Sequence, residues 1–155
     1  MKTHQNIKEI KIVSRVCEDA GVACDHPSRV VELWKKCVET ADWFDPEKEC
    51  VVVFNLNTKL KIKNWQMVSM GTINECALTP REAYRSAVAS LAHSLIVLHN
   101  HPSGNPSPSP ADLDITRRMR DAGKTLGINL QDHIIVGDGK NGNLPHYSFR
   151  EAGYL

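Results

Sequence analysis

The sequence carries almost no excess charge of either sign. Its 155 residues include 19 Lys and Arg against 18 Asp and Glu, so the formal net charge is +1. Proteins that bind nucleic acid by bulk electrostatics usually have a clear basic excess, so the composition disfavours that mode and leaves only a local basic patch open. The fractions of hydrophobic and charged residues, 41% and 24%, argue against a disordered, collagen-like or coiled-coil chain and indicate a globular one.

Long hydrophobic runs and targeting signals are missing as well. The longest apolar runs, 50–54 and 95–98, are far shorter than the ~20 residues that span a bilayer. The polar start at 1–6 is followed by no apolar stretch of the kind found in signal peptides. We therefore expect a cytoplasmic protein without membrane association, whose length fits about one domain.

The five cysteines are odd in number, and no two of them show Cys-x-x-Cys spacing. This argues against a disulfide framework and against a zinc site built from cysteines. We expect reduced, buried thiols that behave as small apolar side chains.

Hydrophobic periodicity predicts a mixed order of strands and helices. Alternating or continuous apolar residues predict strands at 7–16, 50–56, 60–70, 94–98, 128–136 and 147–149. Apolar residues at helical spacing, with proline at the start, predict helices at 28–42, 80–92 and 110–126. Residues 101–110 contain four prolines and three serines and predict a loop. Together these elements predict an α/β domain with helices packed on a sheet.

The residues with the clearest chemistry lie where the strand at 94–98 runs into the proline-rich loop. His99 and His101 are two residues apart, so along a strand their side chains point to the same face. Asp112 lies in the first turn of the following helix and can turn back toward the strand end. Two imidazoles, one carboxylate and one water are the ligands of an open, catalytic zinc site. This spacing predicts one Zn²⁺ ion bound by His99, His101 and Asp112.

Each of these residues also has a simpler explanation. An isolated His-x-His pair seldom binds metal, Asp112 suits the start of a helix, and Ser109 suits an N-cap. The metal interpretation depends on their joint spacing: a His-x-His pair, seven residues, a serine, two residues and an aspartate.

This joint spacing, His-x-His-x7-Ser-x2-Asp, resembles the JAMM metalloprotease motif of MPN domains. The sequence at 99–106, His-Asn-His-Pro-Ser-Gly-Asn-Pro, is similar to that of the RadC family of bacterial JAMM-domain proteins, historically called DNA repair proteins. The resemblance covers roughly 26–150, with further matches at 71–72, 80–82 and 132–137. It implies a JAMM/cytidine-deaminase-like three-layer fold, in which helices flank a mixed, largely antiparallel β-sheet.

The JAMM pattern also requires an upstream glutamate as general acid/base. Glu49 matches it best, because the RadC pattern places this residue just before a strand that leads into a Leu-x-Thr-Lys turn, here 56–59. Without the resemblance, Glu49 would be a solvated charge at a strand edge. Glu47 is the alternative, and the other glutamates considered are Glu75 and Glu82, of which Glu82 suits a capping box.

The resemblance implies a zinc-dependent hydrolase that cleaves an amide or isopeptide bond in a peptide or protein conjugate. Glu49 would take a proton from the attacking water and deliver it to the leaving amine. Ser109 would hydrogen-bond the oxyanion, unless helix capping uses its hydroxyl. His133 is expected to pack or hydrogen-bond within the sheet, and Asp114 to face away from Asp112 on the helix.

Two other functions stay open. The family name implies a DNA repair or recombination accessory protein, to which the basic stretch at 117–124 would contribute. A JAMM fold can also serve as a non-catalytic binding scaffold, although the intact ligand set speaks against that. Full-length RadC proteins have a helix-hairpin-helix region before the JAMM domain. Here residues 1–25 resemble a strand and a loop, so we expect a stand-alone JAMM domain at 26–155.

Overall fold

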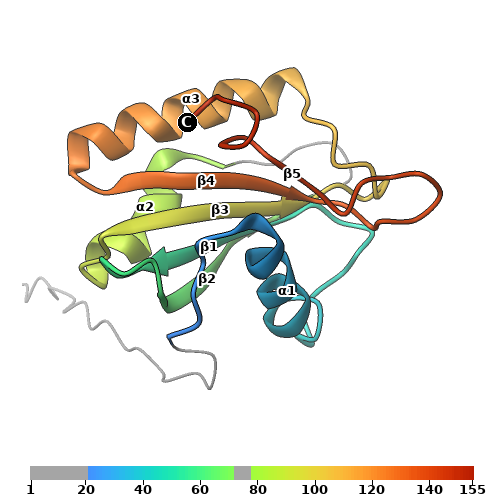
Figure 1. The fold of residues 1–155 in the computed structure, drawn as a ribbon, viewed down its shortest axis with the longest axis horizontal. Helices are drawn as coiled ribbons and strands as arrows, with labels where there is room; N and C mark the ends of the chain where they lie inside the picture. The colour runs from blue at the N-terminus through green and yellow to red at the C-terminus, as the bar shows by residue number, and fades with distance from the viewer. Residues whose placement is uncertain (1–20, 72–77) are drawn as a thin grey trace, which may run out of the picture.

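The computed structural model describes residues 21–71 and 78–155, which form a five-stranded sheet with helices on both faces (Figure 1). The strand order is β2-β1-β3-β4-β5. β3 and β4 are parallel, and the other neighbouring pairs are antiparallel. The strands are β1 (Cys50–Leu56), β2 (Ile62–Met70), β3 (Ser94–Asn100), β4 (Asn129–Val136) and β5 (His146–Ser148). The predicted mixed, largely antiparallel α/β arrangement is confirmed, while the strand expected at 7–16 lies outside the described residues.

Three helices begin as the capping signals predict. α1 (Pro27–Cys37), α2 (Pro80–Ala89) and α3 (Pro110–Leu126) each start with a proline, which has no N–H to leave unpaired in the first turn. The residues before these prolines, His26, Thr79 and Ser109, accept hydrogen bonds from the first turn through their side chains.

Two predicted helix ends are wrong. The first helix ends at Cys37 rather than at residue 42, and the chain continues in turns. Val38 is fully buried in those turns, so the apolar spacing that predicted the helix continues beyond its last residue. The second ends at Ala89 rather than at residue 92, because Leu91 adopts a left-handed backbone with φ of 52°.

The two faces of the sheet bury separate hydrophobic layers. α1 packs its apolar side, which includes Trp34, against one face of the sheet. α2 and α3 pack on the other face, with Tyr84 and Met119 among their buried residues. This three-layer arrangement leaves the carboxyl end of β3 directly beneath the start of α3.

β3 is longer than the sequence predicts, and the extra length matters for the site. The predicted strand stopped at Leu98, but His99 lies opposite Val51 of β1 and Asn100 lies beside Val136 of β4. His99 is therefore part of the sheet and is 2% exposed.

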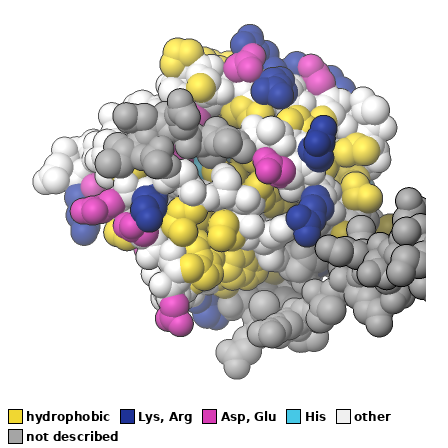
Figure 2. Space-filling view, turned by 180° about the vertical axis from the view of Figure 1, so that it is seen from behind, with side chains coloured by type: hydrophobic (Ala, Val, Ile, Leu, Met, Phe, Trp, Pro, Cys, Tyr) yellow, Lys and Arg dark blue, Asp and Glu magenta, His cyan; other side chains and the backbone are white. Residues whose placement is uncertain are grey.

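The described surface carries mixed charge. On the face shown in Figure 2, basic and acidic side chains are interspersed with apolar and neutral ones. Among residues 21–71 and 78–155, no helix is both long and apolar enough to cross a membrane.

Candidate metal centre

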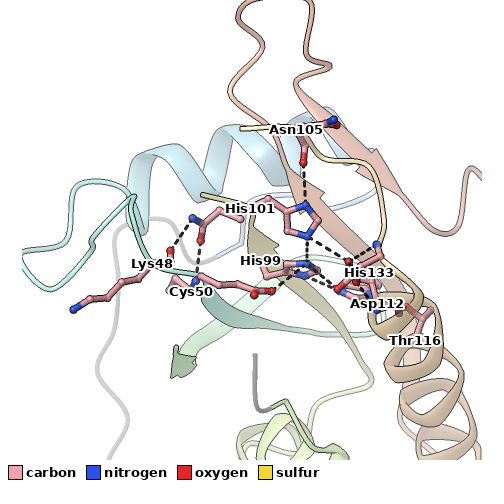
Figure 3. Close-up of polar contacts among 11 residues, drawn as sticks. Lys48, Cys50, His99, His101, Asn105, Asp112, Thr116 and His133 are labelled. Carbon is pink, nitrogen blue, oxygen red and sulfur yellow. Dashed lines mark hydrogen bonds and ion pairs between the residues drawn. The ribbon is translucent and has the colours of Figure 1, made fainter. Parts of the chain in front are cut away.

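Four side chains from three separate segments converge at the carboxyl end of β3. Glu49 immediately precedes β1, His99 and His101 lie at the end of β3 and just beyond it, and Asp112 lies in the first turn of α3. Figure 3 shows the two imidazoles and the Asp112 carboxylate pointing toward one another. One ligand atom from each of the four residues lies within 4.8 Å of the others.

The distances within this cluster fit a tetrahedral metal ion. Nε2 of His99 lies 3.2 Å from Nε2 of His101 and 3.3 Å from Oδ1 of Asp112. Nε2 of His101 lies 3.3 Å from Oδ2 of Asp112. Neighbouring ligand atoms around a tetrahedral ion with bonds of ~2.0–2.1 Å are about 3.3–3.4 Å apart. Two imidazole nitrogens and a carboxylate at this separation can therefore hold one ion between them.

Asp112 serves the helix and the cluster at the same time. Its Oδ2 accepts hydrogen bonds from the backbone N–H and the hydroxyl of Ser109, both at 2.8 Å, and its own N–H donates to Ser109 Oγ. Burial opposes ionisation of Asp112, but its contacts with the imidazoles of His101 and His99 and the hydrogen bond from the Ser109 N–H hold the pKa of its carboxyl well below the usual range. The residue is therefore a carboxylate.

The structure places Ser109 in this capping box rather than free in the site. Its single hydroxyl proton lies on Asp112, so the hydroxyl would have to rotate before it could donate to an oxyanion. That role stays a prediction.

Of the three candidate glutamates that the structure describes, Glu49 is the one that lies beside the histidines. Its Oε1 lies 3.5 Å from Nε2 of His99, beyond hydrogen-bond distance for a strong contact but beside the cluster. Burial raises the pKa of Glu49, and the charge of Asp112 adds to that effect while the histidines oppose it. A carboxyl with a raised pKa suits a group that both takes and returns a proton.

The other glutamates lie elsewhere. Glu47 is exposed, and Glu82 accepts a hydrogen bond from the Thr79 hydroxyl at the start of α2. Glu75 lies outside the described residues.

The proline-rich loop orients His101. Nδ1 of His101 lies 2.9 Å from the backbone carbonyl of Asn105, which can only accept a hydrogen bond. Nδ1 therefore carries a proton, and Nε2 faces the cluster. The loop itself is attached to the β4–β5 connection, since Asp138 donates its N–H to the carbonyl of Gly104.

Above the cluster lies a cavity of about 410 Å³. Its floor is polar, formed by the four cluster residues, Ser109 and His133, and its walls are mainly apolar side chains. The wall residues are Leu78, Pro102, Ser103, Ala111 and Ile115.

Three residues that the sequence reasoning did not assign to the site contact it directly or hold it. His133 on β4 lies 2.9 Å from His99, and burial lowers the pKa of its imidazole well below the ordinary value. Thr116 on α3 lies 2.7 Å from His133. Asn100 hydrogen-bonds the backbone on both sides of Glu49. Thr116 lies one helical turn after Asp112 and therefore on the same side of the helix, and this spacing is the sequence feature that could have predicted its place near the site.

The remaining charged residues near the site face solvent. Asp114 is exposed and lies 3.7 Å from Arg117, as its position two residues beyond Asp112 predicts. Arg120 on the same helix lies 3.2 Å from Asp121.

An α/β domain that gathers a His-x-His pair, an aspartate and a glutamate at one strand end is a candidate metal-binding domain of the JAMM class. The model of the family described as "RadC-like JAB domain" matches residues 24–154, so the chain belongs to the RadC family.

Curated relatives agree with this assignment. A "UPF0758 protein" of Desulforudis audaxviator is 44% identical over 103 residues, which cover 66% of this chain and 44% of that protein. A "UPF0758 protein" of Staphylococcus epidermidis is 41% identical over 134 residues, covering 86% of this chain and 55% of that protein. The chain thus spans about half the length of the curated relatives it matches, and their shared name states no activity.

Proposed function

We propose that this protein is a zinc-dependent metallohydrolase of the JAMM type that cleaves an amide or isopeptide bond of a peptide or protein conjugate. The observation that carries the proposal is the cluster itself: two imidazole Nε2 atoms 3.2 Å apart, each 3.3 Å from an oxygen of the Asp112 carboxylate, with the Glu49 carboxylate beside them. His99, His101 and Asp112 would hold the ion. A zinc ion in such a site supplies Lewis acidity, which polarises a carbonyl and acidifies water.

The protein's own groups supply the proton transfers. Oε1 of Glu49 accepts a proton from a water molecule in the cavity as the water oxygen bonds to the amide carbon. The same carboxyl then donates that proton to the amide nitrogen as the C–N bond breaks, so the leaving group departs as a neutral amine. The apolar cavity walls limit water around the reacting atoms, which strengthens the interactions of the charged floor.

Metal analysis and two glutamate variants test the proposal. Protein purified without chelator should contain close to one zinc per chain, and His99→Ala should lose most of it. Glu49→Gln should keep the zinc yet hydrolyse a panel of peptides and isopeptides at least ~100-fold more slowly, because it removes the proton acceptor. Glu47→Gln is the matched control, since Glu47 is exposed two residues earlier.

Two results would contradict the proposal. One is a protein that binds no zinc even after zinc addition. The other is full hydrolysis by Glu49→Gln, which would exclude Glu49 as the proton acceptor, whereas a zinc-loaded protein that hydrolyses none of the panel would favour the non-catalytic scaffold. In the basic stretch at 117–124, Arg117 and Arg120 both have acidic neighbours, which reduces the positive charge available to DNA. Salt-dependent DNA binding at low salt would revive the DNA hypothesis.

A further inference from the structure

A continuous line of hydrogen bonds joins the backbone of Asp112 to Nδ1 of His99 through Thr116 and His133. The backbone carbonyl of Asp112 lies 2.6 Å from the Thr116 hydroxyl, and that hydroxyl lies 2.7 Å from Nδ1 of His133. Nε2 of His133 then lies 2.9 Å from Nδ1 of His99 (Figure 3). His99, Thr116 and His133 are each at most 2% exposed, so water does not replace any of these partners.

The direction of every proton in this line follows from its first link. A carbonyl oxygen only accepts, and two oxygens 2.6 Å apart without a proton between them would repel each other. The Thr116 proton therefore lies on the Asp112 carbonyl. The hydroxyl oxygen is left as an acceptor, so the proton of the buried, neutral His133 ring lies on Nδ1.

The remaining links are then determined. Nε2 of His133 has no proton and accepts a hydrogen bond, so Nδ1 of His99 must donate one. This leaves Nε2 as the nitrogen of His99 that can offer a lone pair to a metal ion. The His133 ring is held in its plane by Phe149, which stacks on it at a centroid distance of 4.6 Å.

We propose that Thr116 and His133 are positioning residues that fix the Nδ1–H tautomer of His99 and thereby keep its Nε2 free for metal. The expected effect on zinc binding rests on the proposed function. The tautomers do not, because they can be observed in the metal-free protein. The Nδ1–H tautomer of His101 is fixed by a single backbone carbonyl, that of Asn105, whereas the tautomer of His99 depends on two side chains. The line begins at the backbone carbonyl of Asp112. Asp112 therefore supplies its carboxylate as one proposed ligand and helps to orient His99 as another.

Nitrogen NMR of histidine-labelled, metal-free protein tests the proton positions. Long-range ¹H–¹⁵N correlations, assigned with single histidine variants, should show His133 as the Nδ1–H tautomer and His99 protonated at Nδ1. Observation of His133 as the Nε2–H tautomer would overturn the inference, because that line would run in the opposite direction and place the proton of His99 on Nε2. This outcome leaves zinc binding and hydrolysis to be judged separately.

Zinc affinity, measured by chelator competition, tests the consequence. Thr116→Val keeps the side-chain shape but removes the acceptor for His133, so zinc affinity should fall about 10- to 100-fold, as for other partners of metal-ligating histidines. Thr116→Ser keeps the hydroxyl and should restore the affinity. Thr125→Val is the matched control, because Thr125 makes the same hydroxyl-to-carbonyl contact on α3 but is exposed and distant in the helix from the cluster.

The two failures are distinguishable. Unchanged zinc affinity in Thr116→Val, with normal binding by the unmodified protein, would overturn the positioning role and leave the proposed function intact. Equal losses in Thr116→Val and Thr116→Ser would show that packing rather than the hydroxyl is responsible, and would overturn it as well. Absence of zinc binding in the unmodified protein would contradict the proposed function. The NMR measurement would still decide where the protons of His99 and His133 lie.

Discussion

At the scale of single residues, Asn100 shows how one amide side chain can position the proposed general acid/base, which lies just before a neighbouring strand. It lies between the two histidines, yet its side chain turns toward the segment that carries Glu49. Its Nδ2 donates to the carbonyl of Lys48 at 3.0 Å, and its Oδ1 accepts from the N–H of Cys50 at 2.9 Å. These two bonds bracket Glu49 and hold its backbone beside His99.

Replacing Asn100 should therefore separate hydrolysis from metal binding. Asn100→Ala should keep zinc, since no ligand is removed, but should lower the hydrolysis rate and lower the free energy of unfolding by about 1–3 kcal/mol through the unpaired buried groups. Activity assays, zinc analysis and chemical denaturation measure the three effects.

Asn143→Ala is the control, because Asn143 donates to Asp138 in an exposed loop. If Asn100→Ala loses stability but keeps full activity, the bracket is structural and does not position Glu49.

At the scale of elements, the start of α3 couples helix formation to the site. Ser109 and Asp112 satisfy each other's backbone N–H groups, and Pro110 occupies the first helical position. The helix ends at Leu126 and is capped by Gly127, whose φ of 68° is easily reached only without a side chain. Because the capping carboxylate also faces both imidazoles, the cap sets the position of a proposed metal ligand.

Removal of this cap should affect both stability and metal binding. Ser109→Ala removes the hydroxyl that contacts Asp112, so the free energy of unfolding should fall by about 0.5–2 kcal/mol. Zinc affinity should fall too, because the carboxylate loses a contact that orients it. Denaturation and chelator competition measure the two quantities.

The corresponding variant on α2, Thr79→Ala, removes a cap that is not part of the cluster. It should lower stability without changing zinc affinity. Equal zinc affinity in Ser109→Ala and the unmodified protein would show that the cap does not orient Asp112.

At the scale of the whole molecule, burial links stability to pH. Cys24 lies at the bridge between Ala23 and Lys61 and is 1% exposed. Burial raises the pKa of its thiol from 9.0 to about 11, and the charge of Asp25 adds to the effect. A pKa raised by folding means that the folded state binds the thiol proton more tightly than the unfolded chain does.

The stability from this thiol should be fully present below pH 9 and should be lost as the pH rises from 9 to 11. The full loss corresponds to about 2–3 kcal/mol for a shift of two pH units. Denaturation at pH 8 and pH 10, under reducing conditions, should show a smaller decline for Cys24→Ala than for the unmodified protein. Equal declines would contradict this assignment. Burial also raises the pKa of Tyr84, which adds a decline of the same sign at higher pH in both proteins.

The sequence by itself determined the features that depend on neighbouring residues. The helix starts at Pro80 and Pro110 follow from capping residues and proline, and the proposed ligands His99, His101 and Asp112 lie within one strand–loop–helix unit. A unit of that length is constrained by local backbone geometry, so spacing was enough to predict that these side chains meet. The choice of Glu49 needed the family resemblance, because its own surroundings indicate no chemistry.

Only the tertiary structure decided the contacts that cross the sheet. The approach of Glu49 to His99 depends on the antiparallel register of β1 and β3, and the Asn100 bracket strengthens it. His133 reaches His99 because β4 lies parallel to β3, with Thr116 above both. Such contacts join residues 17 to 52 positions apart, and no local propensity specifies strand order or register. The physical reason is burial: the packing of α3 on this face leaves His99 and His133 at most 2% exposed, so their rings contact each other, Thr116 and the Asp112 carboxylate.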